Sequence, residues 1–174
     1  DISYETGKTI LAFPDTEKGH VQLKNYEESQ IIHINAHENE IAKIALTYNG
    51  LLLATASKDG KKIRIFETEK GELLQELNRG KEKAEIKCIS IDNKGQFLAA
   101  SSERGTIHIW SLNQSLEKLQ KMGKIVNIED AKEKNIHNTK SIFSGLPNFL
   151  GGGLFKNEWS FAQVRLDEPY SILS

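Results

Sequence analysis

Two groups of hydroxyl, imidazole and guanidinium side chains recur in this sequence about 45 residues apart. The first group is His37, Thr55, Ser57 and Arg64, and the second is Ser101, Ser102, Thr106 and His108. Between them lies the run Leu77-Asn78-Arg79-Gly80, whose glycine permits close approach to the backbone. Arginine and hydroxyl donors around such a glycine are suited to hold a phosphate group. The alternative is that these polar residues only brace neighbouring strands through internal hydrogen bonds.

No run of residues has the spacing of a catalytic or metal centre. His37-Glu38-Asn39-Glu40-Ile41 is not the two-histidine zinc motif, because isoleucine stands at its fifth position. The run Gly151–Gly153 lacks the Gly-Lys-Ser/Thr ending of a phosphate-binding loop. No Ser/His/Asp or Cys/His arrangement typical of nucleophilic catalysis is evident. We therefore expect no enzyme, no cofactor and no metal ion.

The composition excludes several classes of protein. Lys and Arg number 23 against 24 acidic residues, so no bulk positive charge predicts a nucleic-acid partner, and any anion site must be local. The single cysteine, Cys88, rules out a disulfide framework and is typical of a reducing, cytoplasmic compartment. No apolar run approaches the roughly 20 residues that span a bilayer.

The elements that must position the polar groups are indicated by an internal repeat. Apolar positions, glycines and a final strand that ends on an aromatic residue recur with a shift of about 45 residues. The first copy contains Ile41, Ile44, Gly50, Gly60 and Ile63–Phe66. The second copy contains Ile86, Ile89, Gly95, Gly105 and Ile107–Trp110. A fainter copy includes Ile10–Phe13 and Val21–Leu23. Period-two alternation between glycine-bearing turns predicts short strands, and the repeat length is that of a four-stranded propeller blade.

We therefore predict an all-β, WD40-type β-propeller that is partial, with about three blades. The predicted blades cover 1–35, 36–79 and 80–168, and 169–174 begins the next one. The third blade carries a long inserted loop over 113–157, which has no clear strand pattern before alternation returns in Glu158–Leu166. Propellers close with four to eight blades, so we expect further blades before Asp1 and after Ser174.

The run Leu77–Ile86 resembles the PROPPIN family, whose animal members are the WIPI proteins, in its Arg-Gly motif followed by Ala-Glu-Ile. Supporting similarities include Ala36-His37, Ala54–Ser57, Gly105–Ile109 and Trp159–Ala162. The family consists of seven-bladed propellers that bind phosphoinositides and act in autophagy. The resemblance is greatest to its small, loop-poor branch, and it implies that this chain corresponds to about blades four to six.

The resemblance implies two headgroup sites. One would use His37, Thr55, Ser57, Gly60 and Arg64, and the other would use Arg79, Gly80, Ser102, Thr106 and His108. The first site departs from the family pattern, because Asn78 stands where an arginine belongs and Lys61 replaces a threonine. Asparagine cannot replace the charge or the fork of a guanidinium. We expect the second site to be intact and the first to be altered.

The resemblance also implies that the inserted loop enters the membrane beside these sites. Its apolar residues Ile142, Phe143, Leu146, Phe149 and Leu150 are suited to that. The expected function is a peripheral membrane adaptor in autophagy and endolysosomal trafficking that binds phosphatidylinositol 3-phosphate, with the 3,5-bisphosphate as a further ligand. Autophagy proteins are the expected partners. The alternative is a protein-interaction scaffold with weakened or no lipid binding.

Overall fold

The computed structural model describes residues 1–3, 5, 9–125, 136–140 and 158–166. The first sheet contains β1 (Ile10–Pro14), β2 (His20–Asn25) and β3 (Gln30–Asn35), in that order. The bridge between Ile2 and Leu11 adds a neighbour on the β1 side. All the pairings within this sheet are antiparallel, as short strands joined by tight turns require.

The second sheet is built on β4 (Ile41–Leu46), β5 (Leu52–Ser57), β6 (Lys62–Glu67) and β7 (Leu73–Asn78). The third contains β8 (Ile86–Ile91), β9 (Phe97–Ser102), β10 (Thr106–Ser111) and β13 (Ala162–Arg165). The repeat seen in the sequence is present in detail, because β4 and β8 carry irregularities at equivalent places, Ile41/Lys43 and Ile86/Cys88.

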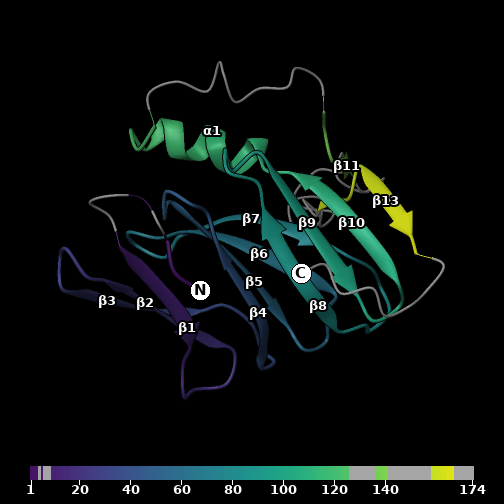
Figure 1. Cartoon of the computed structure of the whole chain (residues 1–174), viewed down its shortest axis with the longest axis horizontal. Coiled ribbons are helices and arrows are strands. Elements are labelled where there is room, and N and C mark those ends of the chain that lie inside the picture. The colour runs from purple at the N-terminus through teal and green to yellow at the C-terminus, as the bar shows by residue number, and fades with distance from the viewer. Residues whose placement is uncertain (4, 6–8, 126–135, 141–157, 167–174) are drawn as a thin grey trace, which may run out of the picture.

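Each neighbouring pair of sheets encloses an apolar core. On β5, Leu53 packs toward the first sheet, whereas Leu52 and Ala54 pack toward the third. Alternate side chains of a strand point to opposite faces, so the first three residues of β5, which face a core on either side, are all apolar. With β4 beside both β1 and β8, the three sheets lie side by side as an arc (Figure 1). The described part of the chain is therefore the predicted all-β, partial propeller.

The structure differs from the sequence prediction in the inserted loop. Its first residues form the helix α1 (Asn113–Lys121), which lies across one end of the sheets (Figure 1). A helix this short is marginal alone, but Leu116 and Leu119 pack into the core between the second and third sheets. The sequence analysis gave an inserted loop over 113–157 and assigned no helix in it; α1 forms there because tertiary packing stabilises it.

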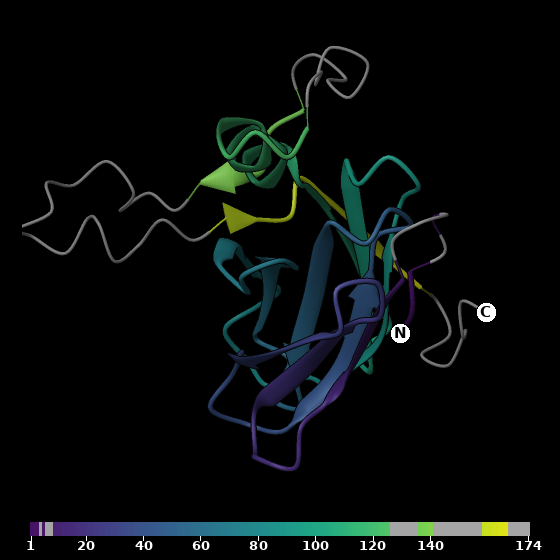
Figure 2. The ribbon, with the colours of Figure 1, turned by 90° about the vertical axis from the view of Figure 1, so that its left-hand side faces the viewer.

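The run Glu158–Leu166 is also divided between two sheets. β12 (Glu158–Trp159) pairs in parallel with β7 and antiparallel with β11 (Thr139–Lys140), so the second sheet has the order β11-β12-β7-β6-β5-β4. After Ser160 and Phe161 the chain joins β10 as β13. Figure 2 shows β11 and β12 close to α1. The residues 169–174, predicted to begin another blade, lie outside the described residues.

Candidate functional site

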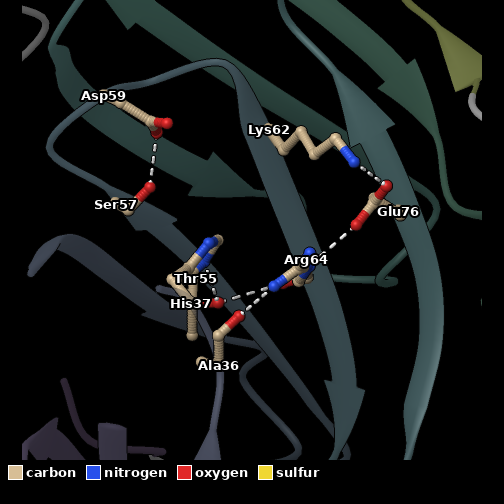
Figure 3. A network of polar contacts seen from close by, with 8 residues as sticks. All are labelled: Ala36, His37, Thr55, Ser57, Asp59, Lys62, Arg64 and Glu76. Carbon is tan, nitrogen blue, oxygen red and sulfur yellow. Dashed lines mark hydrogen bonds and ion pairs between the residues drawn. The ribbon is translucent and has the colours of Figure 1, made fainter. Parts of the chain in front are cut away.

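The first polar group lies where the first and second sheets meet (Figure 3). His37 follows β3, and its Nε2 lies 3.0 Å from Oγ1 of Thr55 on β5. Thr55 is in register with Arg64 on β6. Nη1 of Arg64 donates to the carbonyl of Ala36 at 2.6 Å. The structure therefore brings together His37, Thr55 and Arg64, as the sequence predicted from their types and spacing.

Two carboxylates that the sequence analysis did not single out belong to this group. Glu76 on β7 accepts from Nε of Arg64 at 2.8 Å and from Nζ of Lys62 at 2.6 Å (Figure 3). The hydroxyl of Ser57 donates to Asp59 at 2.6 Å. Burial opposes ionisation of Glu76, but the bonds from Lys62 and Arg64 hold its pKa below the usual value. The cations of this group thus already have a carboxylate partner.

The second polar group lies where the second and third sheets meet. Ser102 ends β9, Thr106 begins β10, and their hydroxyl oxygens are 2.9 Å apart. His108 stacks on Trp110 with ring centroids 5.5 Å apart and planes 18° apart. Both His108 and Arg79 are 6% exposed. Burial, followed by the charge of Arg79, lowers the pKa of His108 to about 4, so the two side chains interact electrostatically.

Arg79 is held in place by the backbone of two loops. Its Nε donates to the carbonyl of Gly60 at 2.8 Å, and its Nη2 donates to the carbonyls of Glu82 and Ala84. Among the described residues, Nη1 has no hydrogen-bond partner. The guanidinium is therefore preorganised, and because Nη2 already donates to two carbonyls, Nη1 is the nitrogen that an anion would meet.

The two candidate glycines have different surroundings. A Cβ on Gly60, whose φ is +59°, would lie 1.8 Å from the carbonyl oxygen of Ala84. Glycine is thus required there by the packing of the two loops that hold Arg79. A Cβ on Gly80 would meet nothing within 4 Å, so open space lies beside it.

Both candidate histidines are neutral at pH 7. Burial and then the charge of Arg64 lower the pKa of His37 to about 4. A neutral imidazole offers one donor and one acceptor. Each histidine can therefore hydrogen-bond a phosphate oxygen, but neither contributes a charge to an anion site.

Asn78 and Lys61 lie at the junction of the two groups. Asn78 ends β7, is buried, and is in register with Trp159 of β12. The carbonyl of Lys61 accepts from the backbone N–H groups of Arg79 and Gly80. The strand pair β11–β12 thus borders the position at which the sequence lacks an arginine.

The predicted membrane-insertion residues lie outside the described residues; they are Ile142, Phe143, Leu146, Phe149 and Leu150. In the described part of the chain, no helix is long and apolar enough to cross a membrane. The same residues contain no cluster of three or more His, Cys, Asp or Glu side chains that could hold a metal ion.

Comparison with known proteins finds a matching family model and similar sequences. The family model described as PROPPIN matches residues 2–122. The chain is 37% identical over 165 residues to Autophagy-related protein 18e of Arabidopsis thaliana, covering 95% of this chain and 39% of that protein. It is 33% identical over 122 residues to Ectopic P granules protein 6 of Caenorhabditis elegans, covering 66% of this chain and 31% of that protein.

Solved structures show the same fold. Kluyveromyces lactis Hsv2 superposes with a TM-score of 0.64 at 20% identity, covering 96% of this chain and 45% of that one. A complex described as KlAtg21 with the coiled-coil of AgAtg16 matches with a TM-score of 0.55 at 24% identity, covering 63% of this chain and 38% of that one. This chain therefore spans less than half the length of the relatives it matches.

Proposed function

This chain belongs to the PROPPIN family, and from that premise we propose that it is the phosphoinositide-binding part of a peripheral membrane adaptor. The ligand we propose is phosphatidylinositol 3-phosphate, with the 3,5-bisphosphate as a second ligand of the same chemistry. The three sheets would be about the fourth to sixth blades of a seven-bladed ring, divided at 1–35, 36–79 and 80–168. Further blades outside this chain would close it.

The second polar group is the observation that supports headgroup binding. A phosphate monoester carries a charge near −2 and accepts several hydrogen bonds. Arg79 offers its Nη1, Ser102 and Thr106 offer hydroxyls, and neutral His108 offers an N–H. The open space beside Gly80 leaves room for the ligand. Together these groups can donate several hydrogen bonds to one phosphate, and Arg79 supplies the positive charge among them.

The first polar group is the weaker candidate. Arg64 and Lys62 already bind Glu76, Ser57 binds Asp59, and the neighbouring Asn78 has no charge. These same features support the alternative function, a protein-interaction scaffold with weak or no lipid binding. The two functions differ in whether Arg79 is needed for recruitment.

Membrane contact by the inserted loop belongs to the same proposal. Each of its apolar side chains would add up to about 1.5–3 kcal/mol if fully buried in the bilayer. A weak headgroup site and a weak insertion loop together give stable anchoring, because lasting attachment usually needs two signals. We propose a cytoplasmic protein that is recruited to phosphoinositide-bearing membranes, works with autophagy proteins and performs no catalytic step.

Flotation of the full-length protein with vesicles tests the function. Phosphatidylcholine vesicles that contain phosphatidylinositol 3-phosphate should recover the protein. Vesicles in which phosphatidylserine supplies the same surface charge should recover much less, because the donors of the second group fit a phosphomonoester. Equal recovery from both kinds of vesicle would exclude specific binding and favour the scaffold.

A further inference from the structure

Ser160 lies in a two-residue crossing between two sheets and touches the second polar group. β12 ends at Trp159 on the second sheet, and β13 begins at Ala162 on the third. Within the crossing, the Oγ of Ser160 lies 3.1 Å from Nδ1 of His108. Phe161 donates its N–H to the carbonyl of Ile109 at 3.1 Å. The far end of the crossing is thus attached to the strand that carries His108.

The near end of the crossing is attached through Glu158, a carboxylate that is 5% exposed. It accepts hydrogen bonds from three side-chain amides, two of them at 2.6 Å, and the donors are Gln75, Asn138 and Gln114. These amides come from β7, from the residue before β11 and from α1. Moving this carboxylate away would leave three amides without their acceptor, and leaving buried polar groups unsatisfied is costly. The three hydrogen bonds therefore hold the crossing in place.

The contact with Ser160 bears on which nitrogen of His108 carries the proton. The imidazole is neutral at pH 7, so one ring nitrogen donates and the other accepts. A serine hydroxyl that donates to Nδ1 leaves the proton on Nε2, which can then donate to a phosphate oxygen. The opposite tautomer would present a lone pair at Nε2, which repels an anion.

We propose that Ser160 is a positioning residue for the headgroup site: its hydroxyl keeps the proton of His108 on Nε2, and Glu158 holds Ser160 in place. The inference rests on the proposed headgroup binding at Arg79 and His108. It extends that site to the far end of the inserted loop, which returns to the propeller at Glu158. The state of a ligand-binding histidine therefore depends on how this end of the loop is attached.

The test compares four single variants and one double variant of the full-length protein in titrations with vesicles containing phosphatidylinositol 3-phosphate. Ser160→Ala should weaken binding about tenfold, as expected for one hydrogen bond, whereas Ser160→Thr keeps the hydroxyl and should bind nearly as well as the wild type. Ser90→Ala, at an exposed serine on β8, is the matched control. Glu158→Gln should weaken binding as Ser160→Ala does, and combining the two should weaken it no further.

Nitrogen-15 spectra of the histidine rings provide a readout that general destabilisation would not move. Ser160→Ala should shift the protonation of His108 away from Nε2, and Ser160→Thr should not. The inference would be overturned if Ser160→Ala leaves the tautomer of His108 unchanged. It would also be overturned if Ser160→Ala binds the vesicles as the wild type does while His108→Ala does not bind. Either result would leave the proposed headgroup binding intact. If neither His108→Ala nor Arg79→Ala affects binding, the headgroup site itself is wrong.

Discussion

Replacing Arg79 with alanine removes the guanidinium at the junction of the second and third sheets whose free Nη1 we assign to the ligand. Nη1 can make a charge-assisted hydrogen bond to a phosphate oxygen, which contributes about 1.5–3 kcal/mol. Since 1.4 kcal/mol is about tenfold in affinity, Arg79→Ala should weaken binding to phosphatidylinositol 3-phosphate vesicles about tenfold to a hundredfold.

A neighbouring arginine separates this effect from a general loss of charge. Arg104 is exposed, interacts electrostatically with Arg79 and donates to the carbonyl of Lys83 at 3.2 Å. Arg104→Ala makes the same change in net charge, but it removes only nearby attraction to an anionic surface, about 1 kcal/mol. Its affinity should fall less than about tenfold. Vesicle co-sedimentation of the full-length protein at fixed ionic strength measures both.

The fold must be checked in parallel, because Arg79 also binds three carbonyls. Urea unfolding should show Arg79→Ala to be less stable by about 1–3 kcal/mol, the cost of an unsatisfied buried acceptor. Arg79→Lys keeps the charge without the fork and should bind at an intermediate level. The reasoning is refuted if folded Arg79→Ala binds no more weakly than Arg104→Ala.

Three further outcomes are expected. Asn78→Arg should tighten binding about tenfold in the same titration, because it supplies a charge-assisted hydrogen bond at the junction; an unchanged affinity would contradict our account of the first group. Glu67→Gln should lower the free energy of unfolding by about 3 kcal/mol, since this wholly buried carboxylate binds the N–H groups of Glu69, Lys70 and Glu72 as well as Lys124. Acidification should destabilise the protein, because the pKa values of His37 and His108 are about 4 when folded, below the usual 6.5. The stability that each neutral histidine contributes is complete above pH 6.5 and is lost as the pH falls toward 4. At pH 5 the free energy of unfolding should be lower by about 2 kcal/mol for each histidine.

Two of these outcomes have a matched variant. Glu69→Gln removes the exposed partner of the same lysine and should cost less than about 1 kcal/mol. His108→Gln should remove about half of the acid-induced loss of stability. If the unfolding midpoint is the same at pH 7.5 and pH 5, the two rings are not held neutral by burial.

The propeller arc and most of the candidate site could be predicted from the sequence, because both depend on local patterns. Strand alternation and turn glycines repeat with the blade, so residues such as Ser57 and Ser102 fall at equivalent places. The carboxylate of Glu76 was missed, although the β6–β7 register sets it opposite Arg64. The signal that would have found Glu76 is an acidic residue opposite a basic one on neighbouring strands of a predicted hairpin.

The sequence by itself determined the repeat, the family and the presence of one arginine where a pair is usual. Only the tertiary structure decided how that arginine is used, because its partners are carbonyls of Gly60, Glu82 and Ala84 on two loops. It also decided that α1 forms and that Glu158–Leu166 divides between two sheets. Such contacts join residues far apart in the chain, and their free energy comes from burial and from amide–carboxylate bonds that no local pattern encodes.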